Sequence, residues 1–214
     1  MATVKRSRAY SSSVREEQAA RTRVRILDAA SELFLDRGYA RTTMQEIADG
    51  AGVARDTVHA VFGSKARVLT ALIDQRLVPD GSVANVTESA EGVAIREETD
   101  QRRQIQLLAR FLAGMSTRLR PIFEILRTAS AVEPEMASVF AEMDRFRMKN
   151  MQTYATWLAA RGPLRMSTRR AGDTIWALAS PDVGRMLCDE LCWSQAQHER
   201  WLADALERTL LGDQ

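Results

Sequence analysis

The stretch from Thr43 to Lys65, TMQEIADGAGVARDTVHAVFGSK, constrains the fold of this chain more than any other. Its apolar residues are spaced as in two short helices that cross steeply through a tight turn, which is the pattern of a helix-turn-helix. Ala48 is small enough for the second helix to cross over it, and Gly52 falls where the turn needs a positive φ. Thr43 and Glu46 have the spacing of a capping box, so the sequence predicts where the first helix begins.

The second helix of this pair, residues 54–62, has a polar face opposite its valines. A helix of this kind enters the major groove of DNA and reads base edges with the side chains near its start. The candidate readers are Arg55, Asp56, Thr57 and His59. Arg55 is the best base reader, because its planar fork can bridge O6 and N7 of a guanine. The side chains predicted to contact phosphates, which fix register more than sequence, are Thr42, Thr43, His59 and Lys65.

Any two short core helices can show an alanine, a glycine and a few valines at these offsets, so the motif alone leaves both interpretations open. The flanking residues favour DNA binding. Residues 25–74, RILDAASELFLDRGYARTTMQEIADGAGVARDTVHAVFGSKARVLTALID, resemble the DNA-binding domain of the TetR family of bacterial regulators. The resemblance is carried by Gly38-Tyr39, Thr42-Thr43, Ile47-Ala48, Ala51-Gly52-Val53 and Phe62-x-Ser64-Lys65. It implies a small DNA-binding part joined to a larger helical part that encloses a ligand cavity.

The chain departs from the family pattern at four positions of the second helix. It has Ala54, Asp56, His59 and Val61, where the family usually has Ser, Gly, Tyr and His. The missing serine cap costs about 1 kcal/mol, and Asp56 in the first turn offsets part of that through the helix dipole. An acid that faces DNA must accept from a cytosine N4 or else repel phosphate. We therefore still expect DNA binding, but the preferred DNA sequence does not follow from the resemblance.

Charge is unevenly distributed along the chain. Residues 1–76 hold 13 Lys/Arg against 9 Asp/Glu, a net charge of +4, while residues 77–214 hold 17 against 19, a net charge of −2. The basic excess thus lies in the part that contains the motif, which favours contact with double-stranded DNA. Two cysteines, an N-terminus unlike a secretion signal and the lack of an apolar run near 18 residues predict a cytoplasmic protein without a membrane span.

The chain is predicted to be all-α, because runs of alternating β-branched residues are missing. We expect a disordered basic arm over 1–17, with Lys5, Arg6 and Arg8 either solvated or touching phosphates or a minor groove. A three-helix DNA-binding domain follows over 18–63, with its first helix ended by Gly38 and Tyr39. A fourth, connecting helix over 64–78, capped by Ser64, and a loop over 79–100 lead to a larger ligand-binding and dimerisation domain over 101–212.

The helices expected in this larger domain come from apolar spacing and from Pro and Ser residues. One helix from Ile105 is ended by Pro121 and is followed by a short helix over 122–126, and Pro134 begins the longest one. Helices are also expected from about 168 and over 182–191, and Ser194 with Gln197 forms a second capping box before a final helix.

No catalytic or metal site is predicted. His59 lies in the second helix of the motif and His198 on a polar helix face, so neither has an activated partner. Cys188 and Cys192, four residues apart, could begin a metal or redox site, but a closed zinc site needs four ligands, so packing cysteines are the better interpretation. Gly-rich phosphate-binding loops are missing too. We predict that the chain is not an enzyme and has no cofactor.

Methionine and aromatic side chains in the larger domain are suited to an adaptable apolar pocket, although ordinary core packing is the default for most of them. The candidates for binding a small, mainly apolar effector are Phe111, Met115, Met148, Met151, Tyr154, Trp157 and Trp176. Glu124 and Glu142 lie near the apolar residues of these helices in the sequence. They could admit a cationic group of the ligand, or they are simply solvated.

A homodimer is expected, because one recognition helix spans only a few base pairs and two copies read successive grooves. In the family the terminal helices make the two-fold contact, and a Leu and Trp stripe would otherwise face water. The predicted interface residues are Ile175, Met186, Trp201, Leu202, Leu206 and Leu210. The hypothesis is thus a ligand-responsive regulator, most often a repressor in this family. The alternatives are an architectural DNA binder without an effector and an α-helical enzyme.

Overall fold

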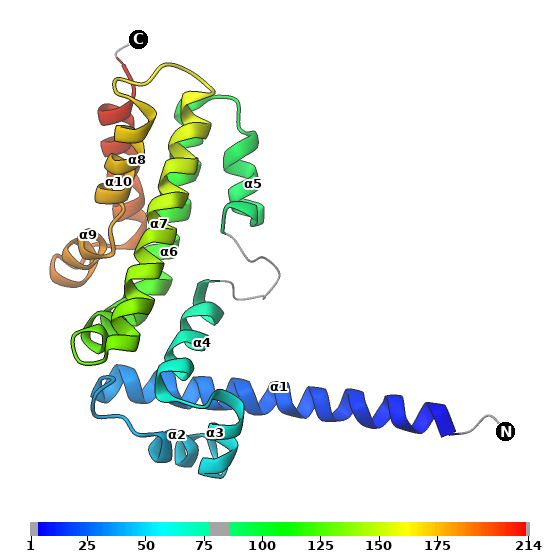
Figure 1. Ribbon diagram of the computed structural model, residues 1–214. Helices are drawn as coiled ribbons and strands as arrows, with labels where there is room; N and C mark the ends of the chain where they lie inside the picture. The colour runs from blue at the N-terminus through cyan, green and yellow to red at the C-terminus, as the bar shows by residue number, and fades with distance from the viewer. Residues whose placement is uncertain (1–3, 78–85, 213–214) are drawn as a thin grey trace. The chain divides into compact units, whose positions relative to one another are not determined.

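The computed structural model describes residues 4–77 and 86–212, and all regular secondary structure in these ranges is helical, as predicted (Figure 1). The chain divides into two compact units inside α4, after Leu72. Unit 1 contains α1 (Val4–Arg37), α2 (Met44–Ala51), α3 (Arg55–Phe62) and most of α4 (Lys65–Leu77). Unit 2 contains η1 (Val86–Glu88), α5 (Ala90–Glu97), α6 (Gln101–Ser130), α7 (Pro134–Ala159), α8 (Thr168–Leu178), α9 (Pro181–Arg185), the short π-helix η2 (Met186–Glu190) and α10 (Gln195–Leu210).

Unit 1 is built on the C-terminal half of α1. This half packs against α2, and α2 packs against α3. The apolar face of α1 contributes Ile26 and Phe34 to the core, and the three shorter helices contribute Ile47, Val58 and Leu69. Because so many large side chains from separate helices meet in one core, the positions of α2 and α3 follow from packing rather than from helix propensity alone.

The first helix begins earlier than predicted. The disordered arm expected over residues 1–17 is wrong for residues 4–17, which are the N-terminal turns of α1, while residues 1–3 lie outside the described part. Adding a turn to an existing helix orders one residue for each new hydrogen bond, and no Gly or Pro interrupts this segment. The side chains of Lys5, Arg6 and Arg8 lie outside the described part, so their contact with DNA stays a prediction.

Unit 2 is a helical bundle organised around α6. This helix packs against both α7 and α10, and α8 packs against α7. Its core is apolar and contains Ile105, Leu108, Leu158, Leu202 and Leu206, all fully buried.

The predicted helix end at Pro121 is wrong, because α6 continues through this residue to Ser130. An interior proline removes one backbone hydrogen bond and costs about 3 kcal/mol. The helix nevertheless buries Leu112 and Ala113 before Pro121 and Ile122 and Leu126 after it. Packing on both sides of the proline therefore keeps the helix in one piece, and this information is not present in the local sequence.

The predicted loop over 79–100 is also wrong in its second half. Residues 78–85 lie outside the described part, but η1 and α5 follow. The hydroxyl of Ser89 accepts a hydrogen bond from the N–H of Gly92, which caps α5, and Ile95 inserts into the core of unit 2. This eight-residue helix is too short to show a clear apolar period in the sequence.

Other helix starts were predicted correctly. Pro134 occupies the first turn of α7, and Ser194 and Gln197 form the reciprocal capping box of α10. The helix expected over 182–191 is divided into α9, capped by Ser180, and η2.

Candidate nucleic-acid interface and ligand cavity

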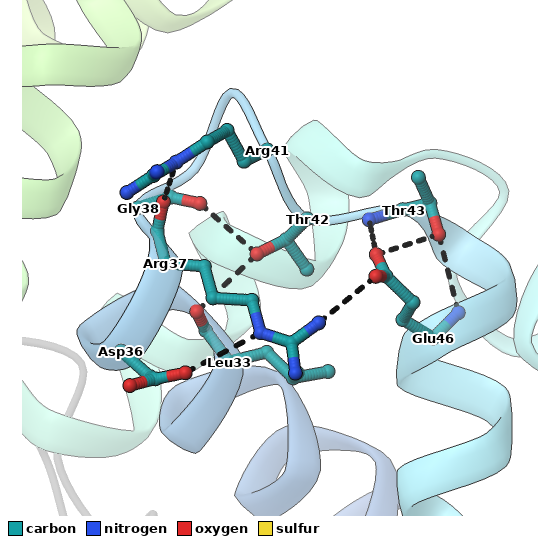
Figure 2. Close-up of polar contacts among 8 residues, drawn as sticks. All are labelled: Leu33, Asp36, Arg37, Gly38, Arg41, Thr42, Thr43 and Glu46. Carbon is teal, nitrogen blue, oxygen red and sulfur yellow. Dashed lines mark hydrogen bonds and ion pairs between the residues drawn. The ribbon is translucent and has the colours of Figure 1, made fainter.

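The connection between α1 and α2 is held by backbone and side-chain hydrogen bonds (Figure 2). Gly38 has a φ of +77°, the left-handed conformation expected of a residue just after a helix. The hydroxyl of Thr42 donates to the carbonyl of Gly38, 3.0 Å away, and also lies 3.3 Å from the carbonyl of Leu33. Thr42 is only 1% exposed. The predicted phosphate contact by its side chain is therefore wrong, since this hydroxyl faces the inside of the turn.

The capping box of α2 is formed as predicted. The hydroxyl of Thr43 accepts from the N–H of Glu46 at 3.2 Å, and the N–H of Thr43 donates to the Glu46 carboxylate at 2.8 Å. Arg37 donates to the same carboxylate at 3.1 Å (Figure 2). The hydrogen bonds from Thr43, and then the charge of Arg37, hold the pKa of Glu46 below its usual value. The N-terminus of α2 is thus fixed, and Thr43 stays exposed.

Two cations beside this turn were missed by the sequence analysis. Arg37 and Arg41 are both exposed, and Nε of Arg41 donates to the carbonyl of Arg37 at 2.8 Å (Figure 2). They lie within seven residues of Thr43, and a basic side chain close to a helix N-terminus is suited to a phosphate contact. The sequence feature that indicates these cations is Arg41, which stands directly before the Thr42-Thr43 pair.

The turn between α2 and α3 is tied to α1. Gly52 has a φ of +63°, as expected, and the N–H of Val53 donates to the carbonyl of Ala48 at 3.0 Å. The guanidinium of Arg25 on α1 donates to the carbonyls of Ala51 and Gly52. A Cβ at Gly52 would lie 2.8 Å from the Arg25 guanidinium. A side chain at this position would therefore be strained and would also displace the arginine.

The polar face of α3 is accessible. Val58 and Phe62 point into the core of unit 1, while Arg55, Asp56 and His59 are exposed and Thr57 is half-buried. Ala54 occupies the N-cap and provides no side-chain hydrogen bond. The four predicted readers thus lie on one helix with three of them exposed, and their contacts with DNA stay a prediction.

Lys65 lies in a different environment from the one predicted. Its ammonium group donates to the carbonyls of Tyr39 and Thr42, at 2.9 and 3.0 Å. It also lies 4.2 Å from the centroid of the Tyr39 ring. This geometry favours a structural role over the predicted phosphate contact, because the charge already serves two inward-facing carbonyls.

Unit 2 encloses a mainly apolar cavity of about 90 Å³ between α6, α7 and neighbouring segments. Four of the predicted ligand residues line it: Phe111, Met115, Met151 and Tyr154. The other three, Met148, Trp157 and Trp176, are not among the lining residues, and the acidic Glu124 and Glu142 are not either. Lining residues that the sequence analysis did not single out include Leu119, Arg120, Phe123, Phe146 and Arg147.

The predicted assignment of apolar residues to a dimer interface is wrong for most of them. Ile175, Leu202, Leu206 and Leu210 are fully buried inside the core of a single chain. An apolar stripe of helical period looks the same in the sequence whether it faces another helix of its own chain or a partner chain. Of the predicted interface residues, Met186 remains 43% exposed and Trp201 half-buried.

His198 is buried rather than placed on a polar face. Its Nδ1 lies 3.8 Å from the Sγ of Cys188. Burial, and then the positive charge of Arg120, lower the pKa of His198. Cys192 is exposed and has a φ of +55°. Within residues 4–77 and 86–212, no group of three His, Cys, Asp or Glu side chains is placed to hold a metal ion.

Among the helices within residues 4–77 and 86–212, none is both long enough and apolar enough to cross a membrane.

The packed α2–α3 pair, the exposed polar face of α3 and the basic turn beside α2 define a helix-turn-helix DNA-binding protein. Residues 26–72 match the family model of bacterial regulatory proteins of the tetR family. This part of the chain is therefore a TetR-family DNA-binding domain, which confirms the resemblance seen in the sequence.

Relatives and solved structures agree with this assignment. The chain is 38% identical over 78 residues to the HTH-type transcriptional regulator TtgR of Pseudomonas putida, covering 36% of this chain and 37% of TtgR. It is 33% identical over 120 residues to the transcriptional activator FasR of Mycolicibacterium smegmatis, covering 54% and 50%. The match thus spans half or less of these relatives. The structure of NalD from Pseudomonas aeruginosa, the secondary repressor of the MexAB-OprM multidrug efflux pump, superposes with a TM-score of 0.70, 25% identity and coverage of 92% of this chain and 100% of NalD.

Proposed function

We propose that this protein is a transcriptional repressor that binds a palindromic operator as a homodimer and is released by a small-molecule effector. The observation that carries the proposal is the exposed polar face of α3, which begins with Arg55 and is held by the capped, buried framework of unit 1. Repression rather than activation is proposed because NalD, which this chain matches over nearly its whole length, is a repressor. The protein would act in the cytoplasm, without a cofactor or catalytic activity.

Within unit 1, Arg55 is proposed to read a guanine, and Asp56, Thr57 and His59 to complete the contact with base edges and phosphates. Thr43, Arg37 and Arg41 are proposed to contact the phosphates that flank the groove. The carboxylates of Asp36 and Glu46 pair with Arg37, which reduces the repulsion that they would exert on the DNA backbone.

Dimerisation is proposed through the outward faces of α8 and α10, with the interface residues changed from those expected. Ala177, Thr174 and Thr209 line a shallow groove between these two helices on the surface of the single chain. Ala177→Arg is expected to give a folded monomer in sedimentation experiments, whereas Ala137→Arg on the exposed face of α7 is the matched control. A dimeric Ala177→Arg variant would exclude this surface.

The effector is proposed to occupy the cavity of unit 2. The solved complex of SmeT with triclosan shows the same fold together with a small molecule. It superposes with a TM-score of 0.65 at 21% identity and covers 90% of this chain and 92% of SmeT. The boundary between the units falls inside α4, so this helix is the covalent link through which we propose that the effector acts. The effector weakens DNA binding only by the ratio of its affinities for the two conformations, typically about 1 to 3 kcal/mol.

The proposal is tested by selecting bound fragments from random and genomic DNA with the purified protein. The expected result is a palindrome whose half-sites lie one turn apart, roughly 34 to 36 Å, or a multiple of it. Enrichment of no common sequence would contradict sequence-specific regulation.

An architectural DNA binder is the second candidate, favoured by the small volume of the cavity, about 90 Å³. Ligands that bind unit 2 tightly and leave the affinity for the selected fragment unchanged would support it.

A further inference from the structure

The cavity of unit 2 is apolar but not uncharged, because two arginines line it. We infer that its ligand is an amphipathic anion, an apolar body with a carboxylate-like head group that pairs with Arg120. This inference rests on the proposed function, since it names the chemical class of the effector. The body of this ligand stays apolar, as expected, but a cationic group admitted by Glu124 or Glu142 is not supported, because neither residue lines the cavity.

Arg120 is a half-buried cation, and one of its guanidinium nitrogens, Nη1, is buried with unused donor capacity. Its side chain is 16% exposed, and its Nε pairs with Asp189 at 2.9 Å, but Asp189 is itself half exposed to water. Among the described residues, no partner accepts a hydrogen bond from its buried Nη1. A buried guanidinium N–H without an acceptor costs free energy, so an anion that enters this cavity gains a charge-assisted hydrogen bond without displacing an existing one.

Arg147 adds a second positive charge to the same lining. Its Nη1 donates to the carbonyl of Trp176 at 2.9 Å, and its guanidinium lies 4.4 Å from the centroid of the Trp176 ring. Its acidic neighbour, Asp144, is 3.6 Å from Nε and its side chain is 41% exposed. Burial lowers the pKa of Arg147, while Asp144 opposes this change. Arg147 is therefore held in place by Trp176, and its charge is only partly compensated.

Two further polar side chains of the lining are suited to the same ligand. The hydroxyls of Ser116 and Tyr154 are buried, and neither has a hydrogen-bond partner among the described residues. Burial raises the pKa of Tyr154, so this hydroxyl stays a donor at neutral pH. Within the described part of the chain the lining has no Asp or Glu side chain. Because Asp189 and Asp144 pair with the arginines from outside this lining, the donors and positive charge that line the cavity select an acceptor that carries negative charge.

The apolar part of the lining sets the body of the ligand. Met115, Met143, Phe111 and Phe146 form much of the wall. The cavity of about 90 Å³ is smaller than the roughly 300 to 1,000 Å³ of typical ligand sites. Methionine side chains change rotamer at little cost, so a flexible aliphatic chain of modest length is the body that this wall can accommodate.

The test is calorimetric titration of the full chain at pH 7.5 with octanoate, 1-octanol and octylamine, which share one chain length and differ in head-group charge. We expect octanoate to bind at least about tenfold more tightly than either of the others, the scale of one charge-assisted hydrogen bond. Equal or tighter binding of octanol or octylamine, or no binding of octanoate, would overturn the inference.

Variants locate the head group. Arg120→Gln should weaken octanoate binding about tenfold and leave octanol binding unchanged, which also shows that the cavity is intact. Arg120→Lys should retain part of the preference. Arg145→Gln, an exposed residue of α7, is the matched control and should change nothing. An Arg120→Gln variant with unaltered octanoate affinity would contradict the assignment. Octanoate binding that leaves operator affinity unchanged would support the anion site and count against the proposed regulation.

Discussion

The ammonium group of Lys65, the first residue of α4, donates a hydrogen bond to the carbonyl of Tyr39 at 2.9 Å and lies 4.2 Å from the centroid of the same residue's ring. A second hydrogen bond goes to the carbonyl of Thr42. One lysine thus joins the start of α4 to the turn between α1 and α2, twenty-six residues earlier in the chain. The turn that presents Thr43 is fixed by this side chain.

Lys65→Ala is therefore expected to destabilise the protein by about 1 to 3 kcal/mol, through two lost hydrogen bonds and one lost cation–π contact. Urea titration measures the free energy of unfolding, and Lys149→Ala, exposed on α7, is the control. The dependence of DNA affinity on salt concentration should keep its slope. A slope lowered by about 1, with unchanged stability, would show that Lys65 contacts a phosphate after all.

Ala54→Ser should stabilise unit 1. Ala54 occupies the N-cap of α3 with a φ of −68° and a ψ of 147°, and it provides no side-chain acceptor for the first N–H groups. A serine in this conformation supplies one, which is worth about 1 kcal/mol. The check is thermal or urea unfolding of the variant beside Ala60→Ser, an exposed position inside the same helix where serine gives no cap. Equal effects at the two positions would argue against the cap.

Leu206→Arg should unfold unit 2 rather than separate a dimer. Leu206 is 0% exposed and lies in the core of a single chain, so an arginine there buries an unpaired charge at a cost of several kcal/mol. We expect loss of helical circular dichroism, whereas Ala196→Arg, exposed on the same helix, should stay folded. A folded, monomeric Leu206→Arg variant would restore the interpretation of this stripe as an interface.

The stability of the protein should fall as the pH drops from 7.5 towards 5 because of His198. Burial and Arg120 lower the pKa of this residue below its usual 6.5. The unfolded chain therefore binds the proton more readily, so the stability present above pH 6.5 is lost as the pH falls towards the folded-state pKa. The slope is at most about 1.4 kcal/mol per pH unit for one proton.

Urea unfolding at a series of pH values measures this dependence. His198→Gln should remove it, and His59→Gln, at an exposed position, should leave it unchanged. The carboxylates with lowered pKa values, Glu46, Glu98 and Glu124, contribute only below about 4.5 and do not enter this range. A slope that persists in His198→Gln would assign the effect to another group.

Features set by neighbouring residues could be predicted from the sequence. The Thr43 and Glu46 capping box, the left-handed Gly38 and Gly52, and the Ser194 cap each depend on a few adjacent positions, and all are present. The helix-turn-helix was predicted from local spacing together with the family resemblance of residues 25–74.

Features set by distant residues could not be predicted. Pro121 looked like a helix end because its compensation comes from packing on both sides of α6. Leu206 looked like an interface residue because periodicity does not show which helix covers a stripe. Thr42 and Lys65 looked like phosphate contacts, and only the fold shows that they face the carbonyls of the α1–α2 turn. Arg120 and Arg147 lie on two different helices and line the same cavity. No local feature of the sequence predicts that they come together.

The most direct test of the central claim, that α3 reads DNA, is the affinity of the Arg55→Ala variant for the selected operator. We predict a loss of about 1 to 3 kcal/mol on that operator, with relaxed preference at one base position in each half-site and little change on shuffled DNA. Arg145→Ala in unit 2 is the control and should bind as the wild type does. Equal losses of affinity on operator and shuffled DNA would contradict base reading by Arg55, and no loss on either would contradict the placement of α3 in the groove.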